Sequence, residues 1–302
     1  MQKENFGIIC ASLRNDILNM AAGRNWSQQD LADATDLPLK VIGQIERGEK
    51  VNLHSELLIC LADAFNLTTT ERKRFFSLAS DITSEEVSRN DQSIFTVFNV
   101  TLHEAQQIRQ PVLLHDGLYR IIGLNTAYMQ TYGLTSDYLE SIPESDPTKY
   151  HIVRHIHDSD SPVRNVYKSQ IEKVEMNNAV YWRFLSIANR HDPLFNKIQD
   201  QLLNDYPRFA YLWNSLRHRF ENVDASSLLR SFHCNHPNFG LLRYLVVSTQ
   251  LYSGKRELFM TQLSPTDHKT FSMFNKLIED KEFEFVCFDP MVSQLEEVSN
   301  LT

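Results

Sequence analysis

Residues 26–48 read WSQQDLADATDLPLKVIGQIERG, and this stretch decides how the first part of the chain folds. Ser27 is a favourable N-cap, and Asp30 follows it three residues later. Apolar residues then recur at helical spacing in two short runs. Pro38 suits the first turn of the second run, where its missing N–H is harmless, and Gly48 suits its end. The stretch therefore predicts two short helices joined by a tight turn.

Three more helices are expected around this pair. Apolar residues at steps of three and four predict a helix that begins near Phe6 and ends near Gly23. Further helices are expected over residues 54–65 and 69–79. Within the helix pair, the residues expected to face inward are Leu31, Ala32, Ala34, Val41, Ile42 and Ile45. Five short helices around one small core predict an all-α domain over residues 1–80.

The length and charge of the chain bound its class. The chain has 302 residues, of which 42% are hydrophobic, enough to fill the cores of about two domains. Its formal net charge is -8, and residues 1–80 contain nine Lys and Arg against ten Asp and Glu. This balance excludes a protein that coats nucleic acid through bulk charge. Binding to DNA would require basic residues gathered on one face.

Cysteine spacing and apolar run lengths narrow the class further. Cys10, Cys60, Cys234 and Cys287 form no Cys-x-x-Cys pair, which favours free thiols over a metal ribbon. No apolar run approaches the ~18 residues of a membrane span. The first residues lack the pattern of a signal peptide. We therefore expect a cytoplasmic protein without membrane insertion.

Three motifs at fixed spacing point to a known family. They are Ser27-Gln28-x-x-Leu31-Ala32, Val41-Ile42-x-x-Ile45-Glu46-Arg47-Gly48 and Leu57-x-x-x-Leu61-Ala62-x-Ala64-Phe65. With them, residues 6–79 resemble the lambda-repressor/Cro (xenobiotic-response-element, XRE) type of helix-turn-helix DNA-binding domain. One departure is Asp36 at the turn, where the family usually has Gly. Asp tolerates a left-handed backbone better than most residues, so we expect the turn to form.

The resemblance implies a set of DNA-contacting residues. Gln28 would hold a phosphate, Lys40 and Gln44 would reach base edges, and Leu39 would touch a thymine methyl group. The full implied set is Ser27, Gln28, Gln29, Leu39, Lys40, Gly43, Gln44 and Arg47. The alternative is that Gln28, Lys40 and Gln44 are ordinary solvated residues. Such modules commonly bind paired half-sites, so a homodimer on a double-stranded DNA operator is expected.

The rest of the chain predicts a second domain of mixed composition. Polar residues 81–94 are expected to form a linker, residues 95–290 a domain, and residues 291–302 a polar tail. A helix over 102–108, strands over 111–114 and 119–124 and a helix capped by Asn125 are typical of the opening of a PAS-type fold. Beyond it we expect helices over 162–187, 194–203, 207–220 and 269–277, and strands over 241–249, 258–263 and 283–288. The sheet should be antiparallel and the class α+β.

Sparse motifs in this second part resemble the MmyB-like domain of bacterial regulators. They are residues 116–125, Asp192-Pro193, Leu203 with Tyr206-Pro207-Arg208-Phe209-x-x-x-Trp213, His236-Pro237-x-x-Gly240-x-Leu242 and Leu263-Ser264-Pro265. The resemblance covers residues 100–270 and implies a PAS-like domain that holds a fatty acid or a similar apolar ligand. The residues we expect to bind it are Tyr128, Tyr132, Trp182, Phe209, Trp213, Arg243 and Tyr244. Arg243 would orient a carboxylate, with Arg217 and Arg230 as alternatives. The aromatic residues could instead simply fill the core.

Two histidine clusters suggest metal sites at first sight. His151, His155 and His157 precede Asp158 and Asp160, but no catalytic Glu lies inside the motif. We favour a solvated, histidine-rich connector there over a metal site.

The second cluster is His233-Cys234-x-His236, which cannot close a tetrahedral site alone, so a structural His236 is favoured. Phosphate-binding loops and Gly-x-Ser-x-Gly are absent from the sequence. We therefore expect no enzyme, no metal and no cofactor apart from an apolar ligand.

The sequence thus predicts a ligand-responsive transcriptional regulator. Two alternatives stay open at this point. In one, the second domain has a filled core and only dimerises or binds a partner. In the other, it is an enzyme joined to a DNA-binding domain.

Overall fold

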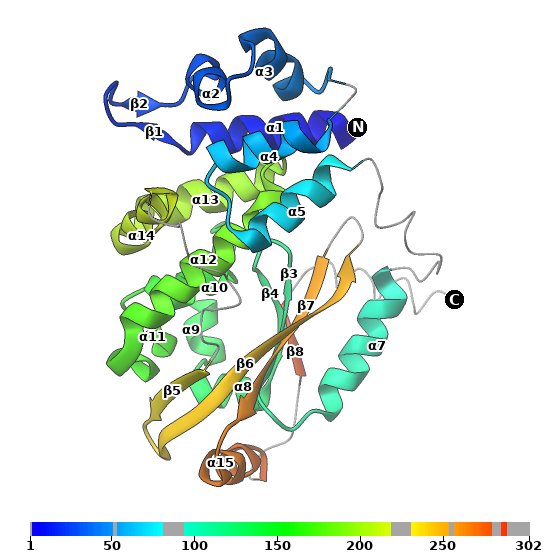
Figure 1. Ribbon diagram of the computed structural model, residues 1–302. Coiled ribbons are helices and arrows are strands. Elements are labelled where there is room, and N and C mark those ends of the chain that lie inside the picture. Colours follow the sequence, from blue (N-terminus) through cyan, green and yellow to red (C-terminus); the bar gives the residue numbers. More distant parts are fainter. Residues whose placement is uncertain are drawn as a thin grey trace.

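The chain folds into a helical head that sits on a larger domain built around one antiparallel sheet (Figure 1). The computed structural model describes residues 2–50, 53–80, 94–218, 231–253, 257–279 and 285–288. We call residues 2–80 the head and residues 94–288 the C-terminal domain. The expected linker, apart from residue 94, and the expected polar tail lie outside the described residues.

The head contains α1 to α5 and a small hairpin. Its elements are α1 (Gln2–Asn15), β1 (Leu18–Asn19), β2 (Arg24–Asn25), α2 (Gln28–Thr35), α3 (Leu39–Glu46), α4 (Ser55–Ala64) and α5 (Thr69–Ala79). The expectation that the first helix reaches Gly23 is wrong. The chain leaves α1 at Asn15 and turns back as a hairpin that pairs Leu18 with Asn25. Gly23 lies in its turn with φ +62°, a value that favours glycine.

Short-range capping explains where α2 begins and ends. The Ser27 side chain accepts a hydrogen bond from the backbone N–H of Asp30, and the Asp30 carboxylate accepts one from the backbone N–H of Ser27. Asp36 ends the helix in the left-handed region, with φ 53°. The expected inward face needs one correction, because Thr35 is buried and Ala34 is exposed. The Thr35 hydroxyl donates to the Leu31 carbonyl and is thereby satisfied inside the core.

The sheet of the C-terminal domain joins strands from both ends of its sequence. The strands are β3 (Val112–Asp116), β4 (Ile121–Asn125), β5 (Ser231–His236), β6 (Gly240–Ser253), β7 (Glu257–Pro265) and β8 (Phe285–Cys287). Their order is β5-β6-β7-β3-β4-β8, and every neighbouring pair is antiparallel. β3 pairs with β7, a strand almost 150 residues later, as Leu114 does with Met260.

Helices cover both faces of this sheet. They are α7 (Ile94–Gln107), α8 (Thr126–Tyr132), α9 (Ser136–Glu140), α10 (Ile152–His157), α11 (Pro162–Val166), η1 (Lys168–Gln170), α12 (Ile171–Asn189), α13 (Pro193–Asp205), α14 (Pro207–His218) and α15 (His268–Glu279). α7 lies on one side and α10 to α14 on the other (Figure 1). The expectation of one helix over residues 162–187 is wrong, since the chain breaks at Tyr167 and continues as a 3-10 turn before α12.

α12 belongs to both parts of the molecule. Trp182 and Leu185 are buried in the core of the C-terminal domain, whereas Ile187 is fully buried among the apolar residues of the head. Ion pairs reinforce this junction. Arg190 binds Asp16 at 2.5 Å, and Arg183 binds Glu71 at 2.8 Å.

A third ion pair of the junction joins α5 to the sheet, between Arg74 and Glu257. No helix of the described residues is both long enough and apolar enough to cross a membrane.

Candidate nucleic-acid interface and ligand cavity

The outer surface of the head is formed by α3, which lies at the end of the molecule farthest from the sheet (Figure 1). Lys40 is exposed, Leu39 is 45% exposed and Gln44 is half-buried. Gly7 lets α3 rest closely on α1, because a Cβ at this position would lie 2.5 Å from the backbone oxygen of Glu46. α3 therefore presents Leu39, Lys40 and Gln44 outward on a rigid support.

Glu46 ties α3 to the two preceding helices. Its carboxylate accepts hydrogen bonds from Arg14 Nε at 2.6 Å and Arg14 Nη2 at 3.0 Å. It also accepts one from Gln28 Nε2 at 2.8 Å. The resemblance assigned Gln28 to a phosphate, but one of its amide hydrogens is bonded to Glu46 and helps to fix the angle between α2 and α3. The outward face of α3, with Leu39, Lys40 and Gln44, is therefore oriented by contacts within the head.

The other residues of the implied DNA-contacting set are engaged locally. Ser27 donates its hydroxyl to Asp30, Gln29 donates to Asp33 at 2.7 Å, and Arg47 binds Glu49 at 2.7 Å. Gly43 corrects the sequence analysis, which placed it on the exposed face. It is buried, and a Cβ there would lie 3.0 Å from Arg47 Nη1. The absence of a side chain at Gly43 makes room for the Arg47 guanidinium.

The comparison with known families decides what this arrangement is. Residues 21–72 match the helix-turn-helix family. The match spans α2 to α4 and the first part of α5, so the head carries an XRE-type helix-turn-helix, as its motifs indicated. This family match indicates a DNA-binding transcription regulator. A comparison of the chain with curated proteins finds no match.

A cavity of about 280 Å³ lies in the C-terminal domain below the helix-turn-helix head. Its walls come from several elements. α12 contributes Asn177, Tyr181 and Phe184, the sheet contributes Val246 and Thr261, and α5 of the head contributes Thr70; α8, α10 and α11 also take part. The walls are mostly apolar, which suits a small apolar ligand.

Three tyrosine hydroxyls meet beside the cavity. Tyr132 and Tyr167 lie 2.5 Å apart, Tyr132 and Tyr244 lie 3.0 Å apart, and Tyr244 donates to Tyr167 at 2.8 Å. Burial raises the pKa of each phenol well above its ordinary value. The three hydroxyls are therefore neutral at pH 7.

The structure brings only part of the expected ligand set to the cavity. Tyr128 and Tyr132 line it, but the described lining does not include Trp182, Phe209, Trp213, Arg243 or Tyr244. The Trp182 indole donates to Gln199 at 2.6 Å in the core, and Phe209 packs on Trp213. The lining residues missed by sequence reasoning, such as Thr70 and Asn177, carry no local signal because separate elements bring them together.

Arg243 does not reach the cavity. The sequence analysis expected it to orient the carboxylate of a bound ligand. Its side chain is 59% exposed and lies 3.6 Å from Asp267. Alternation along β6 is the reason, since Leu242 and Tyr244 face the core and the residue between them faces solvent. The alternative cations, Arg230 and the side chain of Arg217, lie outside the described residues.

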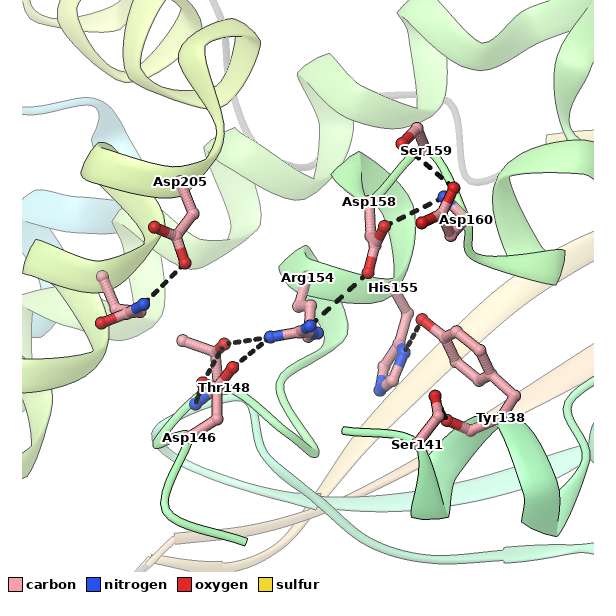
Figure 2. A network of polar contacts seen from close by, with 11 residues as sticks. Tyr138, Ser141, Asp146, Thr148, Arg154, His155, Asp158, Ser159, Asp160 and Asp205 are labelled. Atoms are coloured by element: carbon pink, nitrogen blue, oxygen red, sulfur yellow. Dashed lines mark hydrogen bonds and ion pairs between the residues drawn. The ribbon is translucent and has the colours of Figure 1, made fainter. Parts of the chain in front are cut away.

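The expected solvated histidine connector is also wrong, because His151, His155 and His157 are all buried. His151 caps α10 by accepting from the backbone N–H of Val153. His155 Nδ1 lies 3.3 Å from the Tyr138 hydroxyl. Figure 2 shows this contact next to the network around Arg154. Burial lowers the pKa of His155 to about 3 and that of His157 to about 4, so both are neutral at pH 7.

The Arg154 network holds the chain between α9 and α11 in place. Arg154 binds Asp146, donates to the Thr148 hydroxyl at 3.1 Å and lies 3.6 Å from Asp158 (Figure 2). These partners all lie between α9 and α11, so Arg154 holds this part of the chain in its fold. Among the described residues, no three His, Cys, Asp or Glu side chains gather as a metal site would require.

The second histidine motif is structural, as expected. His236 Nε2 lies 3.1 Å from the Gln130 carbonyl, and His236 Nδ1 accepts from the backbone N–H of Asn238. It thereby joins β5 to α8.

Proposed function

We propose that this protein is a transcription regulator whose binding to a double-stranded DNA operator responds to a small apolar molecule held in the cavity. The carrying observation is the position of α12. One side of this helix lines the cavity with Asn177 and Tyr181, and the same helix inserts Ile187 into the core of the head. A molecule that moves α12 would therefore move the helix-turn-helix.

The residues around Phe184 give this coupling a physical route. Phe184 lines the cavity, and the Arg74 guanidinium lies over its ring, 5.1 Å from the centroid. Arg74 belongs to α5 and also binds Glu257 at the start of β7. A displaced Phe184 would disturb both contacts. The ligand acts only if it binds two arrangements of the head unequally.

A homodimer completes the proposal. Helix-turn-helix modules read half-sites one helical turn of DNA apart, and dimer symmetry sets the spacing. We propose that the ligand changes the relative placement of two such heads. Fatty acids, which the MmyB-like resemblance implies, are one class of apolar ligand.

Cavity-filling and matched surface variants of β6 test the ligand response. Val246 lines the cavity, whereas the next residue, Val247, is 43% exposed on the other face of the strand. Val246→Trp should fill the cavity and change the affinity for DNA fragments selected by the wild-type protein at least tenfold, measured by gel shift. Val247→Trp should leave that affinity within twofold.

Native mass spectrometry of the same purified proteins provides the second readout. The wild-type protein and Val247→Trp should appear as dimers with a co-purifying small molecule, and Val246→Trp should lack that molecule. A ligand-free wild-type monomer whose DNA affinity equals that of Val246→Trp would contradict the proposal. Thermal unfolding checks that both variants are folded.

A further inference from the structure

We infer that the molecule held in the cavity is uncharged: a compact, mostly apolar compound with a neutral hydrogen-bond donor, and not a carboxylate or another ion. The inference rests on the proposed function and names the chemical class of its ligand.

The described walls of the cavity carry no charged side chain. Among the described residues that line the cavity there is no Lys, Arg, Asp or Glu. His155 is the titratable lining residue whose ordinary pKa lies nearest neutrality, and burial lowers this pKa to about 3. The described walls thus present neutral groups to a ligand at pH 7.

Two arginines flank the lining residue Phe184, and each is already paired with a carboxylate. Arg74 binds Glu257, and Arg183 binds Glu71 at 2.8 Å and the Leu216 carbonyl. Recruiting either arginine to a ligand anion would strip a mostly buried acid of its partner. Such separation is strongly unfavourable in a low-dielectric interior.

The tyrosine hydroxyls beside the cavity determine which polar group of a ligand fits there. The hydroxyls of Tyr132 and Tyr167 contact each other and that of Tyr244, and their lone pairs can accept a hydrogen bond from a donor in the cavity. Tyr119 donates to Asn178 at 2.7 Å. Lone pairs attract an O–H or N–H group and repel a carboxylate. Beside the tyrosine cluster, a neutral donor therefore fits better than an anion.

Burial of an unpaired carboxylate in such a site is unfavourable, because no counter-charge offsets the loss of its hydration. The cavity volume of about 280 Å³ is at the lower end for small-molecule sites, which limits the ligand to a compact molecule. Charge and size together favour compounds such as alcohols and amides with a short alkyl or aromatic body.

Three probes with ten carbon atoms test the inference on the full-length wild-type protein: 1-decanol, decanoate and decane. We expect 1-decanol to bind at least tenfold tighter than decanoate at pH 7.5, measured by competition against the co-purified molecule in native mass spectrometry. Decane should bind more weakly than 1-decanol because it cannot donate to the tyrosine cluster.

A charge-introducing variant gives an independent readout. Asn177 is half-buried in the wall on α12. Asn177→Lys should reverse the preference so that decanoate binds at least tenfold tighter than 1-decanol, while Asn177→Gln keeps the wild-type order. Equal or tighter binding of decanoate to the wild-type protein, lost in Val246→Trp, would overturn the uncharged class and leave the proposed function intact. Binding of none of the probes to the wild-type protein would overturn both.

Discussion

The head and the C-terminal domain place their candidate functional side chains differently. In the head, Leu39 and Lys40 of α3 are exposed and Gln44 is half-buried. In the C-terminal domain, five histidines of the described residues and a cluster of tyrosine hydroxyls are buried. The comparison teaches that the head keeps its chemistry on the surface for DNA, while the C-terminal domain encloses its chemistry around a cavity.

The largest expected difference between the head and the C-terminal domain is in their stability at acidic pH. Burial lowers the pKa of His115 and His157 to about 4, that of His155 to about 3, and that of His151 well below its ordinary value. Below pH ~6.5 these histidines bind protons in the unfolded chain but stay neutral in the folded domain. The free energy of unfolding therefore falls as the pH drops. His115, His155 and His157 should each lower the free energy of unfolding by about 2 kcal/mol at pH 5, and His151 should act in the same direction.

Urea unfolding of Trp26→Phe at pH 7 and pH 5 measures this effect, because the remaining Trp182 and Trp213 both belong to the C-terminal domain. The head contains a single histidine, the exposed His54, and should resist acid better. His233→Gln is the control, since His233 is exposed. A stability that stays constant between pH 7 and pH 5 would show that the buried histidines take up protons without loss.

Removal of the outward side chains of α3 should give the next largest effect. Lys40→Ala with Gln44→Ala should weaken binding to DNA selected by the wild-type protein at least ~30-fold, since each contact to a base edge contributes about 1–3 kcal/mol. The melting temperature should stay unchanged because Lys40 is exposed and Gln44 is half-buried. Lys269→Ala, on α15 at the far end of the molecule, is the control (Figure 1). Undiminished gel-shift affinity would move the reading face elsewhere.

The turn between α2 and α3 should give the smallest effect. Asp36 has φ 53°, where a Cβ is unfavourable by roughly 1 kcal/mol. Asp36→Gly should therefore raise the free energy of unfolding by about 1 kcal/mol, partly offset by the greater entropy of glycine in the unfolded chain. Asp36→Ala should lower it. Urea unfolding decides, and a loss of stability in Asp36→Gly would show that the aspartate itself stabilises the turn.

The same contrast explains how much the sequence could predict. The capping pair Ser27 and Asp30, the turn at Asp36 and the bounds of α5 all depend on neighbours in the sequence, so local patterns predicted them. The order of the strands does not, because β3 pairs with residues almost 150 positions later. No local signal reports such a partner.

The errors at the candidate site have the same origin. His151 and His155 were assigned to a solvated connector, yet both are buried, and the contact of the His151 ring with Trp182 of α12 comes from a distant part of the chain. Thr70 was assigned only to a helix, and its place in the cavity wall follows from how α5 lies on α12. Arg243 was the one avoidable error, because the alternation of Leu242 and Tyr244 already predicts that it faces outward.

Ile187 limits how this protein could have arisen by recombination of gene segments. A DNA-binding domain whose core is complete in itself can be joined to many other domains. Here one side chain of the core of the head, Ile187, lies in α12, more than one hundred residues after the head ends. An exchange of C-terminal domains at residue 80 would leave that core open to water. A viable chimera must therefore inherit α12, or a helix that copies its Ile187, along with the head.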